Sequence, residues 1–394
     1  MNKLSTKIAA LLVLTVGVVV IFITWNIYSS KREHDETKLT NKADMDNMTD
    51  MGEFGEMSDM ASMYCTNTSS TDPKCLEYFA QRETLSAEEK AQQDNIMVGE
   101  SSTKQSITPE DYLTTWNFNN LSAKERAKVY KETPQPDGTM LREYWITAKD
   151  EDVEIAPGVT FPGWTYNGQV PGPTIRATEG DTVKIYFKND GNKAHTIHTH
   201  GFHPASMDGS MSGDFVYPGG TFTYEFTAEP FGLHLYHCHS SPLKQHIAKG
   251  LYGVYIIDPK VDQRPKADKE LVMVMNGFDT DGDGENEVYG VNTEAFYYAR
   301  HPIQVKKGEL VRIFLVNVLE NDPLNSLHLH GNFFDEYRTG TQFESDNFTD
   351  ITSFVQGERA ILDVRFKFKG MYMFHAHQSE FTEKGWMGFF EVTE

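Results

Sequence analysis

The sequence predicts an all-β protein built from two copies of one β-sandwich domain, and three observations support this fold class. From about Leu141 onward, short β-branched and aromatic runs alternate with clusters of Gly, Pro, Asn and Asp, as in antiparallel sandwiches. Runs with helical periodicity are scarce after about residue 135. Finally, the second half of the chain repeats the motif order of the first half, which predicts a duplicated domain.

The repeat defines the two domains. GDTVKIYFKN followed by HTIHTHG recurs as GELVRIFLVN followed by HLHG. LHLYHCH followed by KGLYGVYII recurs as YMFHAH followed by KGWMGFFEV. The repeat length of about 130 residues and the order of strands resemble the cupredoxin fold. We therefore expect cupredoxin-like Greek-key domains at residues 140–262 and 268–394.

A continuous apolar stretch precedes the domains at residues 8–28 and is long enough to span a bilayer as a helix. Lys3 and Lys7 precede it, and Lys31 and Arg32 follow it. The length of the run and the lack of a convincing cleavage site favour a transmembrane anchor, with a cleaved signal peptide as the alternative. Under either interpretation the rest of the chain is exported, and the anchor would hold it at the extracytoplasmic face of the membrane.

Residues 31–139 predict a partly helical, partly disordered extension. The acidic, Met-rich stretch 44–63 is interpreted as a flexible tether, although thioethers also bind cuprous copper and copper capture is the alternative. Residues 109–131 favour one or two helices, and Ser122 with Glu125 forms a capping-box pattern. The net charge of -21 argues against binding to nucleic acid, whose phosphates would repel it.

The chain has three cysteines, and they divide into two kinds. Cys65 and Cys75 are close in sequence, so we expect them to form a disulfide outside the cell. Cys238 lies between two histidines and is better explained by metal chemistry.

Eight of the fourteen histidines form four His-x-His pairs at matching positions of the two repeats. Residues i and i+2 of a strand point to the same face, so each pair directs two imidazoles into one space. Imidazole is a ligand for copper, zinc and iron, and cupric copper binds most tightly of these divalent ions. The pairs are His198/His200, His237/His239, His328/His330 and His375/His377.

Cys238 must face away from His237 and His239, because a strand alternates its faces. The corresponding residue of the second repeat is Ala376, so only the first domain offers a thiolate. A blue copper site needs one Cys, two His and a weak or absent axial ligand. His195 and His246 are the candidate histidines.

Leu251 stands where an axial Met would lie in such a site. Leucine cannot coordinate, and we expect the loss of a thioether donor to raise the reduction potential.

These residues resemble the multicopper oxidase family. TYNGQVPGPTIRATEGDTVKIYFKN, HTIHTHG, LYHCH, HLHG and FHAH occur in the family's order, and the resemblance covers residues 141–394. The arrangement is similar to two-domain, laccase-like oxidases whose blue copper lies in the first domain. Those oxidases imply a homotrimer with each three-copper cluster between domain 1 of one subunit and domain 2 of the next.

The resemblance implies a role for each motif residue. Asp208 matches an acidic residue that relays protons to the cluster, while a simple turn aspartate before Gly209 is the alternative. The copper ions expected are one type 1, one type 2 and two type 3. The ligands would be His195, Cys238 and His246 for type 1, His198 and His328 for type 2, and His200, His237, His239, His330, His375 and His377 for type 3.

The implied activity is one-electron oxidation of a reductant coupled to four-electron reduction of dioxygen to water. Phenols and cuprous, ferrous or manganous ions are the candidate reductants. A copper nitrite reductase is the main alternative, because the spacing from Cys238 to His246 resembles that family; yet those enzymes place an aspartate where this chain has His198 and lack the histidine that His239 supplies. A copper electron-transfer protein without turnover is the third alternative.

Asp279 to Glu287 (DTDGDGENE) begins like a calcium-binding loop. The twelfth position would be Gly290 rather than Glu. An exposed acidic turn is therefore the preferred interpretation, with calcium as the alternative.

Overall fold

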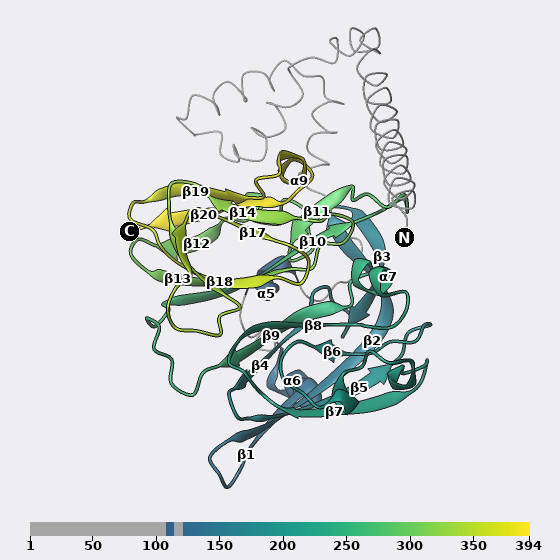
Figure 1. Cartoon of the computed structure of the whole chain (residues 1–394). Helices are drawn as coiled ribbons and strands as arrows, with labels where there is room; N and C mark the ends of the chain where they lie inside the picture. The colour runs from purple at the N-terminus through teal and green to yellow at the C-terminus, as the bar shows by residue number, and fades with distance from the viewer. Residues whose placement is uncertain (1–107, 114–120) are drawn as a thin grey trace, which may run out of the picture. The chain divides into compact units, whose positions relative to one another are not determined.

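The computed structural model describes residues 108–113 and 121–394. These residues form a mostly β, two-domain, cupredoxin-like structure with few and short helices (Figure 1). Among them, no helix combines the length and the apolarity that crossing a bilayer requires. The predicted anchor at 8–28, the Met-rich stretch and the Cys65–Cys75 disulfide lie outside the described residues, so they stay predictions.

The first domain contains two sheets. Its first sheet has the order β1-β2-β5-β7, with β3 paired to the other part of β2, and its second has the order β4-β9-β8-β6. The strands of the first sheet are β1 (Tyr130–Pro134), β2 (Met140–Ala156), β3 (Val159–Tyr166), β5 (Thr182–Asn189) and β7 (Thr221–Thr227). Those of the second are β4 (Gly172–Thr178), β6 (His198–Thr199), β8 (Gly232–His237) and β9 (Tyr252–Asp258). The helices are α6 (Ala123–Val129), η3 (Ala205–Met207), η4 (Ser212–Asp214) and α7 (Leu243–Ala248).

The second domain repeats this plan. Its sheets have the orders β11-β10-β13-β18-β15-β16 and β12-β20-β19-β14-β17. The strands of the third sheet are β10 (Lys269–Phe278), β11 (Val288–Val291), β13 (Leu310–Asn317), β15 (Phe334–Arg338), β16 (Asn347–Thr349) and β18 (Arg359–Arg365). Those of the fourth are β12 (Ile303–Lys306), β14 (Asn325–Leu329), β17 (Ile351–Phe354), β19 (Gly370–His375) and β20 (Met387–Thr393). The helices are α5 (Pro109–Tyr112), α8 (Tyr297–Arg300) and α9 (Ser379–Glu383).

Three apolar cores separate the four sheets into stacked layers (Figure 1). One core lies inside each sandwich, and the third joins the second sheet to the third sheet. Alternate residues of β9 divide between two cores: Tyr255 and Ile257 face the first sandwich, whereas Val254 and Ile256 face the second domain. This explains why β8, β9, β10 and β13 are buried along nearly their whole length instead of alternating with exposed residues.

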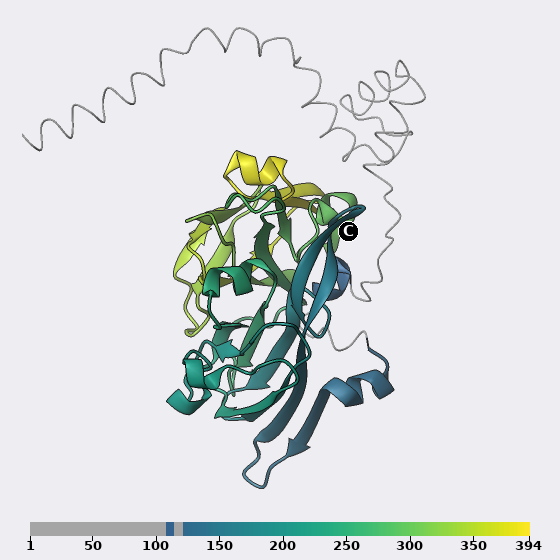
Figure 2. The same ribbon diagram turned by 90° about the vertical axis from the view of Figure 1, so that its right-hand side faces the viewer.

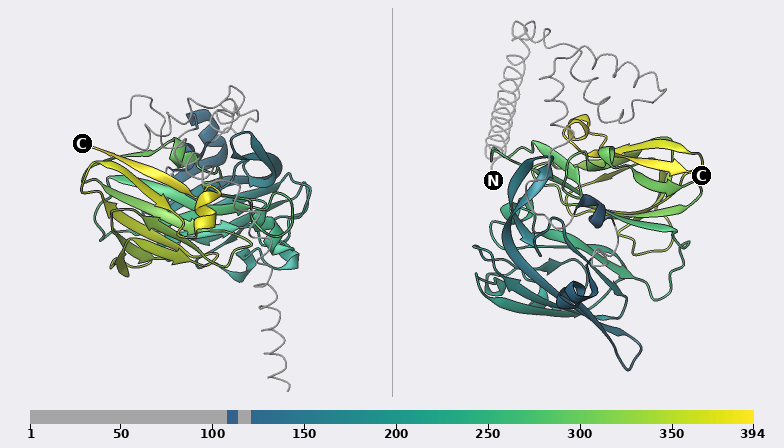
Figure 3. Two further views of the ribbon diagram at one scale, coloured as in Figure 1. Left: turned by 90° about the horizontal axis from the view of Figure 1, so that it is seen from above. Right: turned by 180° about the vertical axis from the view of Figure 1, so that it is seen from behind.

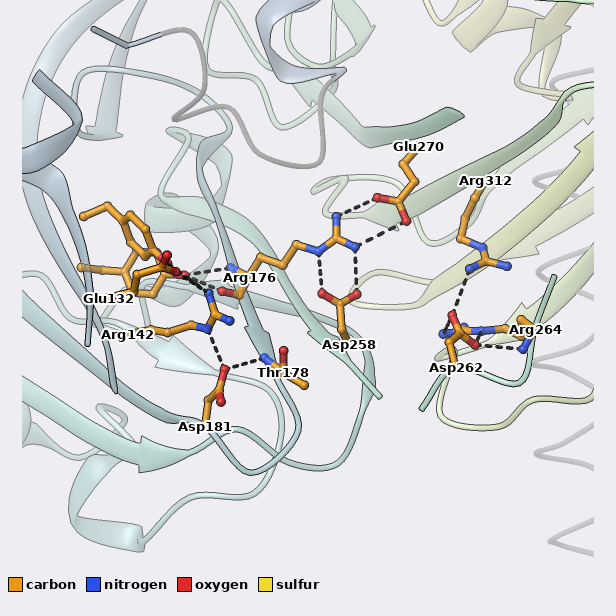
Figure 4. Close-up of polar contacts among 12 residues, drawn as sticks. Glu132, Arg142, Arg176, Thr178, Asp181, Asp258, Asp262, Arg264, Glu270 and Arg312 are labelled. Carbon is orange, nitrogen blue, oxygen red and sulfur yellow. Dashed lines mark hydrogen bonds and ion pairs between the residues drawn. The ribbon is translucent and has the colours of Figure 1, made fainter. Parts of the chain in front are cut away.

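Two further contacts fix the domains against each other. The far half of β2, with β3, extends alongside the second domain (Figure 2), where the Ala295 N–H donates to the Ile155 carbonyl at 2.8 Å. The Arg176 guanidinium on β4 binds Asp258 at the end of β9 and Glu270 on β10, with the shortest contact to each at 2.7 Å (Figure 4). The first domain therefore cannot turn freely on the second.

The helices predicted near residues 109–131 are α5 and α6, and both are short. The capping box is confirmed: the Glu125 N–H donates to Ser122 Oγ, and the Ser122 N–H donates to the Glu125 carboxylate. From Tyr130 the chain is already a strand, because β1 pairs with β2 and extends the first sheet.

Candidate metal centre

His195, Cys238 and His246 converge on one buried point inside the first sandwich. Their ligand atoms lie 3.2 Å (His195 Nδ1 to His246 Nδ1), 3.1 Å (Cys238 Sγ to His246 Nδ1) and 3.9 Å (Cys238 Sγ to His195 Nδ1) apart. Cys238 follows β8 directly, and His246 lies on α7, which begins five residues after Cys238. One soft sulfur and two imidazole nitrogens in a trigonal arrangement suit copper.

Burial prepares these three side chains for a metal ion. They are at most 2% exposed. Burial lowers the pKa of His195 to about 3, assisted by the neighbouring His246, and lowers the pKa of His246 to about 4. Both imidazoles are therefore neutral at pH 7 with a lone pair available. Burial raises the pKa of the Cys238 thiol, although the Thr196 N–H, which donates to Sγ at 3.3 Å, favours the thiolate. A metal cation would supply the missing stabilisation.

Leu251 belongs to the apolar cluster that surrounds Cys238 and is fully buried. Its carbonyl accepts from the Cys238 N–H at 2.9 Å, and its N–H donates to the His246 carbonyl at 3.2 Å. The backbone thus holds Leu251 beside the two ligands, with an aliphatic side chain that cannot coordinate.

The four histidines of the two His-x-His pairs in the first domain gather on the opposite face of the second sheet. His198 on β6 pairs with His237 on β8, and their rings lie 5.2 Å apart. His200 Nε2 lies 3.3 Å from His237 Nε2, and the ring of His239 lies 5.2 Å from that of His198. We refer to these four residues as the domain-1 quartet.

Backbone carbonyls set the orientation of two of these rings. His198 Nδ1 lies 2.8 Å from the Asp208 carbonyl, and His237 Nδ1 lies 3.0 Å from the Cys238 carbonyl. A carbonyl can only accept, so each Nδ1 carries the proton and each Nε2 keeps its lone pair. Burial lowers the pKa of His237 to about 4 and that of His200 to about 3, so these rings are neutral at pH 7.

The second domain reproduces this arrangement in detail. His328 on β14 pairs with His375 on β19, and His328 Nδ1 lies 2.9 Å from the Asp350 carbonyl. His330 Nε2 lies 2.9 Å from His375 Nε2, and the His377 ring lies 5.4 Å from that of His328. Burial lowers the pKa of both His330 and His375. We refer to His328, His330, His375 and His377 as the domain-2 quartet.

The nitrogen distances fit a metal centre. Nitrogens bound to one ion at about 2.0–2.1 Å and at tetrahedral angles lie roughly 3.3 Å apart. The 3.3 Å and 2.9 Å Nε2 separations in the two quartets are close to that value. His237 and His375 each donate from Nδ1 to a backbone carbonyl, so each directs the lone pair of Nε2 towards its neighbouring histidine, where a cation would be held.

The two quartets lie on different layers of the chain. Leu233 and Leu235 on β8, which share the face of His237, pack in the core between the two domains. Phe374 and Ala376 face the core of the second sandwich, so His375 and His377 lie on the outer face of the fourth sheet. That sheet contains the last two strands, β19 and β20, which are yellow in Figure 3, and it is the outermost layer. Sheets pack about 10 Å apart, so the third and fourth sheets separate the quartets by roughly 20 Å in one chain.

An aspartate accompanies each quartet. Asp208 Oδ1 lies 3.3 Å from His198 Nδ1, and Asp350 Oδ2 lies 3.8 Å from His328 Nδ1. Partial burial opposes ionisation of Asp208, yet the hydroxyl of Ser210 and the nearby His198 outweigh it and lower the pKa of Asp208. The structure therefore brings Asp208 to the domain-1 quartet as an ionised carboxylate.

The acidic loop after β10 also gathers carboxylates. Ligand oxygens of Asp279, Asp281, Asp283 and Glu287 lie within 4.8 Å of one another. Glu287 accepts from the Thr280 N–H at 2.6 Å, and Asp279 accepts from the Gly282 N–H at 2.6 Å. The geometry allows either the acidic turn or the calcium loop considered from the sequence.

Asp350 and Trp164 were not found from the sequence. Asp350 follows His328 by 22 residues, whereas Asp208 follows His198 by 10, so the repeat does not align them. Trp164 on β3 contacts the rings of both His195 and His246, at 5.3 Å and 4.8 Å between centroids. The motifs that the two repeats share begin after Trp164, so the repeat gave no sign of it.

Comparison with known proteins gives a consistent result. Residues 147–262 and 264–394 match two family models, each described as multicopper oxidase. The copper-containing nitrite reductase of Neisseria meningitidis serogroup B is 32% identical over an alignment of 275 residues that covers 63% of this chain and 69% of that protein. A crystal structure of a multicopper oxidase is 53% identical with a TM-score of 0.68, covering 73% of this chain and 97% of the other. The copper nitrite reductase from Nitrosomonas europaea is 31% identical with a TM-score of 0.60, covering 64% and 94% of the two chains.

Proposed function

Because the chain belongs to the multicopper oxidase family, and because it carries eight histidines in two quartets beside a Cys238 site, we propose that it reduces dioxygen to water with electrons from a small reductant. The observation that carries the proposal is the matched pair of quartets. A nitrite reductase needs a single catalytic copper besides its blue copper, which would leave most of the eight imidazoles without a role.

The sites divide by their chemistry. His195, Cys238 and His246 would hold a type 1 copper, which accepts single electrons, while the quartets would hold a type 2 and two type 3 copper ions, where dioxygen is reduced. His198 and His328 occupy the equivalent first positions of the two quartets and would hold type 2. The other six, His200, His237, His239, His330, His375 and His377, would hold type 3.

The chain itself links the sites. His237 and His239 are the covalent neighbours of Cys238 and face the opposite side of β8. An electron could therefore pass from one site to the other through the Cys238 side chain and one peptide bond, either to His237 or to His239. The His239 N–H donates to Thr196 Oγ1 at 3.0 Å, and the Thr196 N–H donates to Cys238 Sγ at 3.3 Å, so a second, hydrogen-bonded link runs in parallel.

Two carboxylates are placed to hold protons near the cluster. Asp208 and Asp350 lie beside the first histidine of each quartet. Reduction of dioxygen to water consumes protons, and a carboxylate this close to a ligand can accept them from solvent and hand them on. We assign this role to Asp208, which the family resemblance indicates, and extend it to Asp350 in the second domain.

The cluster would form between subunits of a homotrimer. One chain keeps its quartets on separate layers, so completing a cluster requires the domain-1 quartet of one subunit and the domain-2 quartet of the next. Large apolar side chains stand exposed near each quartet: Phe202 (66%) follows His200, and Phe333 (51%), whose ring lies 5.3 Å from that of Phe348, follows His330. Such residues are typical of a protein interface. An anchor at residues 8–28 would place this trimer on the outer side of the membrane.

The test combines metal counting with turnover. A fully loaded sample is expected to contain four copper ions per chain and to show both blue absorption and type 2 and type 3 signals. It should consume dioxygen with a phenol or with cuprous, ferrous or manganous ions as donor, without releasing peroxide, and the metal-free protein is the control.

Similarity to nitrite reductases makes nitrite the second candidate substrate. Two copper ions per chain, together with nitric oxide release from nitrite under argon, would replace the oxidase proposal with that one. A blue protein that turns over neither acceptor would favour simple electron transfer.

A further inference from the structure

We propose that Trp164 is the surface contact through which reductants pass electrons to the type 1 site. This inference rests on the proposed function in one respect, because it takes His195, Cys238 and His246 as copper ligands. The contact between the indole and the two imidazoles is independent of that assumption.

The ligands themselves are closed to solvent. His195 and Cys238 are 0% exposed and His246 is 2% exposed, whereas Trp164 is 8% exposed. A reductant cannot lie against any of the three ligand side chains in this structure. A side chain that both touches the ligands and reaches solvent would therefore decide how closely a donor approaches.

Trp164 meets that description through its ring geometry. Its indole lies 4.8 Å from the His246 ring and 5.3 Å from the His195 ring, both at 61° between planes. Edge contacts of this kind bring two aromatic π systems into van der Waals contact. Among residues 121–394, it is the one non-ligand ring recorded against both imidazoles.

The backbone holds the indole in place. The Trp164 N–H donates to the Lys249 carbonyl at 2.8 Å, in the turn that follows α7. Gly250 adopts φ +112°, and a Cβ there would lie 3.0 Å from the Trp164 carbonyl and 2.5 Å from Val170 Cγ2. β3 and the α7 turn thus pack too closely for a side chain at Gly250. The turn that positions His246 also positions Trp164.

Lys249 packs against β3 beside Trp164. The Lys249 ammonium lies 4.3 Å from the Phe161 ring centroid and donates to the Pro162 carbonyl at 3.2 Å. The aliphatic stem of Lys249 lies with it along β3. We therefore assign approach of small donors to the Trp164 edge and treat Trp164 as a positioning residue for electron transfer.

The electron balance is simple. Each reductant molecule that docks at Trp164 loses one electron, and one cupric ion bound by His195, Cys238 and His246 is converted to cuprous. The indole gives and receives nothing overall, and no bond to it is made or broken. Any proton that the oxidised donor releases goes to solvent.

The experiment measures reduction of the blue band by stopped flow under argon, with a small outer-sphere metal complex as donor, in the copper-loaded full chain. Trp164→Leu is expected to slow the bimolecular reduction several-fold, and Trp164→Phe should recover only part of the rate. Spectroelectrochemistry gives the type 1 potential of each variant, so that a change in driving force can be subtracted. Trp145→Leu on β2, whose ring stacks on Tyr186 at 4.9 Å, is the matched control and should react like the parent.

A second readout does not involve electron transfer. Copper addition should quench the fluorescence of a tryptophan in contact with the ligands. The quenched component should be absent from Trp164→Phe and present in Trp145→Leu. The same quenching in Trp164→Phe would show that another tryptophan reports on the site and would contradict the placement.

Three outcomes overturn the inference: reduction of Trp164→Leu as fast as that of the parent, faster reduction of that variant, or a slower rate explained by the change in potential alone. If Trp164→Leu fails to bind type 1 copper, the parent-like rate of Trp164→Phe becomes the contradicting result. A parent protein without a blue band would overturn the inference together with the copper assignment. The rate is measured without dioxygen, so it does not depend on oxygen turnover. A blue protein that does not react with dioxygen would contradict the proposed function, and the inference about Trp164 would still be decided by the reduction rates.

Discussion

The two sandwiches have the same main-chain arrangement around the Cys238 position. Only the first domain has the side chains that would hold the type 1 metal. In the first domain the Cys238 N–H donates to the Leu251 carbonyl at 2.9 Å, and the Leu251 N–H donates to the His246 carbonyl at 3.2 Å. In the second domain the Ala376 N–H donates to the Trp386 carbonyl at 3.2 Å, and the Trp386 N–H donates to the Phe381 carbonyl at 2.8 Å. The main-chain frame is therefore shared.

The side chains on that frame differ completely. His195, Cys238, His246 and Leu251 are replaced by Asn325, Ala376, Phe381 and Trp386, respectively, at the positions that these hydrogen bonds and the repeat define. Trp386 and Ala376 are fully buried. In the second domain, an indole and a phenyl ring thus fill the space that the first domain leaves for a metal.

The quartets behave in the opposite way. The His239 N–H donates to Thr196 Oγ1 at 3.0 Å, and the His377 N–H donates to Ser326 Oγ at 2.8 Å. The frame, the ligands and their supporting hydroxyls are all retained in both domains. The comparison indicates that the cluster needs both domains, whereas the electron acceptor is needed once per chain.

The strongest way to break this comparison is Cys238→Ser. Removing the thiolate should abolish the blue absorption, lower bound copper by one ion per chain and reduce turnover by several orders of magnitude. Copper analysis, absorption and oxygen uptake measure these changes. Ala376→Ser, at the matching position of the second domain, should keep the blue band and most of the activity, and a comparable loss there would contradict the asymmetry.

Truncation of Trp386, which fills the space in the second domain, should lower the stability of the fold without changing the blue absorption. Trp386 is fully buried, so Trp386→Ala is expected to lower the free energy of unfolding by about 3–5 kcal/mol while the blue spectrum of the folded protein is unchanged. Leu251→Ala should cost about 2–5 kcal/mol and also disturb the blue spectrum. Denaturant titration and absorption test both variants, and a blue band altered by Trp386→Ala would count against independent pockets.

We expect part of the loss of folding stability at low pH to come from His234 in the first domain. The matching position in the second repeat is Tyr372. Burial, with a smaller effect of Arg359, lowers the pKa of His234 to about 4. The unfolded chain, with a His pKa of about 6.5, binds more protons below that pH, so stability falls as pH drops from about 6.5 towards 4. Between pH 7 and pH 5 the free energy of unfolding of the metal-free protein should therefore fall by about 1–2 kcal/mol less in His234→Gln than in the parent.

Urea midpoints of the parent and the variant at both pH values measure this difference. The comparison concerns the change with pH, because the substitution also alters packing at both. An equal loss in the two proteins would place the acid sensitivity elsewhere.

The smallest structural change with a specific expected signal is Leu251→Met. The exchange nearly conserves volume and should cost less than about 1.5 kcal/mol. A thioether beside the copper should lower the type 1 potential and shift the absorption spectrum. Leu271→Met on β10, also buried, is the control that should change neither.

Sequence reasoning predicted the parts of this molecule that follow from local periodicity. The duplicated strand pattern predicted two cupredoxin-like sandwiches, which the structure and the family match confirm. Alternation of strand faces predicted that Cys238 points away from His237, and Cys238 indeed lies in the first core while His237 faces the other way.

What could not be predicted depends on packing between layers. Both faces of β8 are buried because the third sheet covers the second, which the pattern of a single strand does not reveal. Asp350 and Trp164 reach their sites through loops and strands whose positions no local pattern encodes. The distance between the quartets likewise follows from the order of four sheets, not from spacing along the chain.

The central claim is that quartets of different subunits together form one cluster, and subunit mixing tests it most directly. His237→Gln disables the domain-1 quartet and His375→Gln the domain-2 quartet, while both variants keep Cys238 and should stay blue. Each alone should be inactive, whereas co-assembled, differently tagged chains should regain roughly one quarter of the parent activity, the fraction of interfaces at which two intact quartets meet by chance. Mixed oligomers that co-purify and remain inactive would contradict the account.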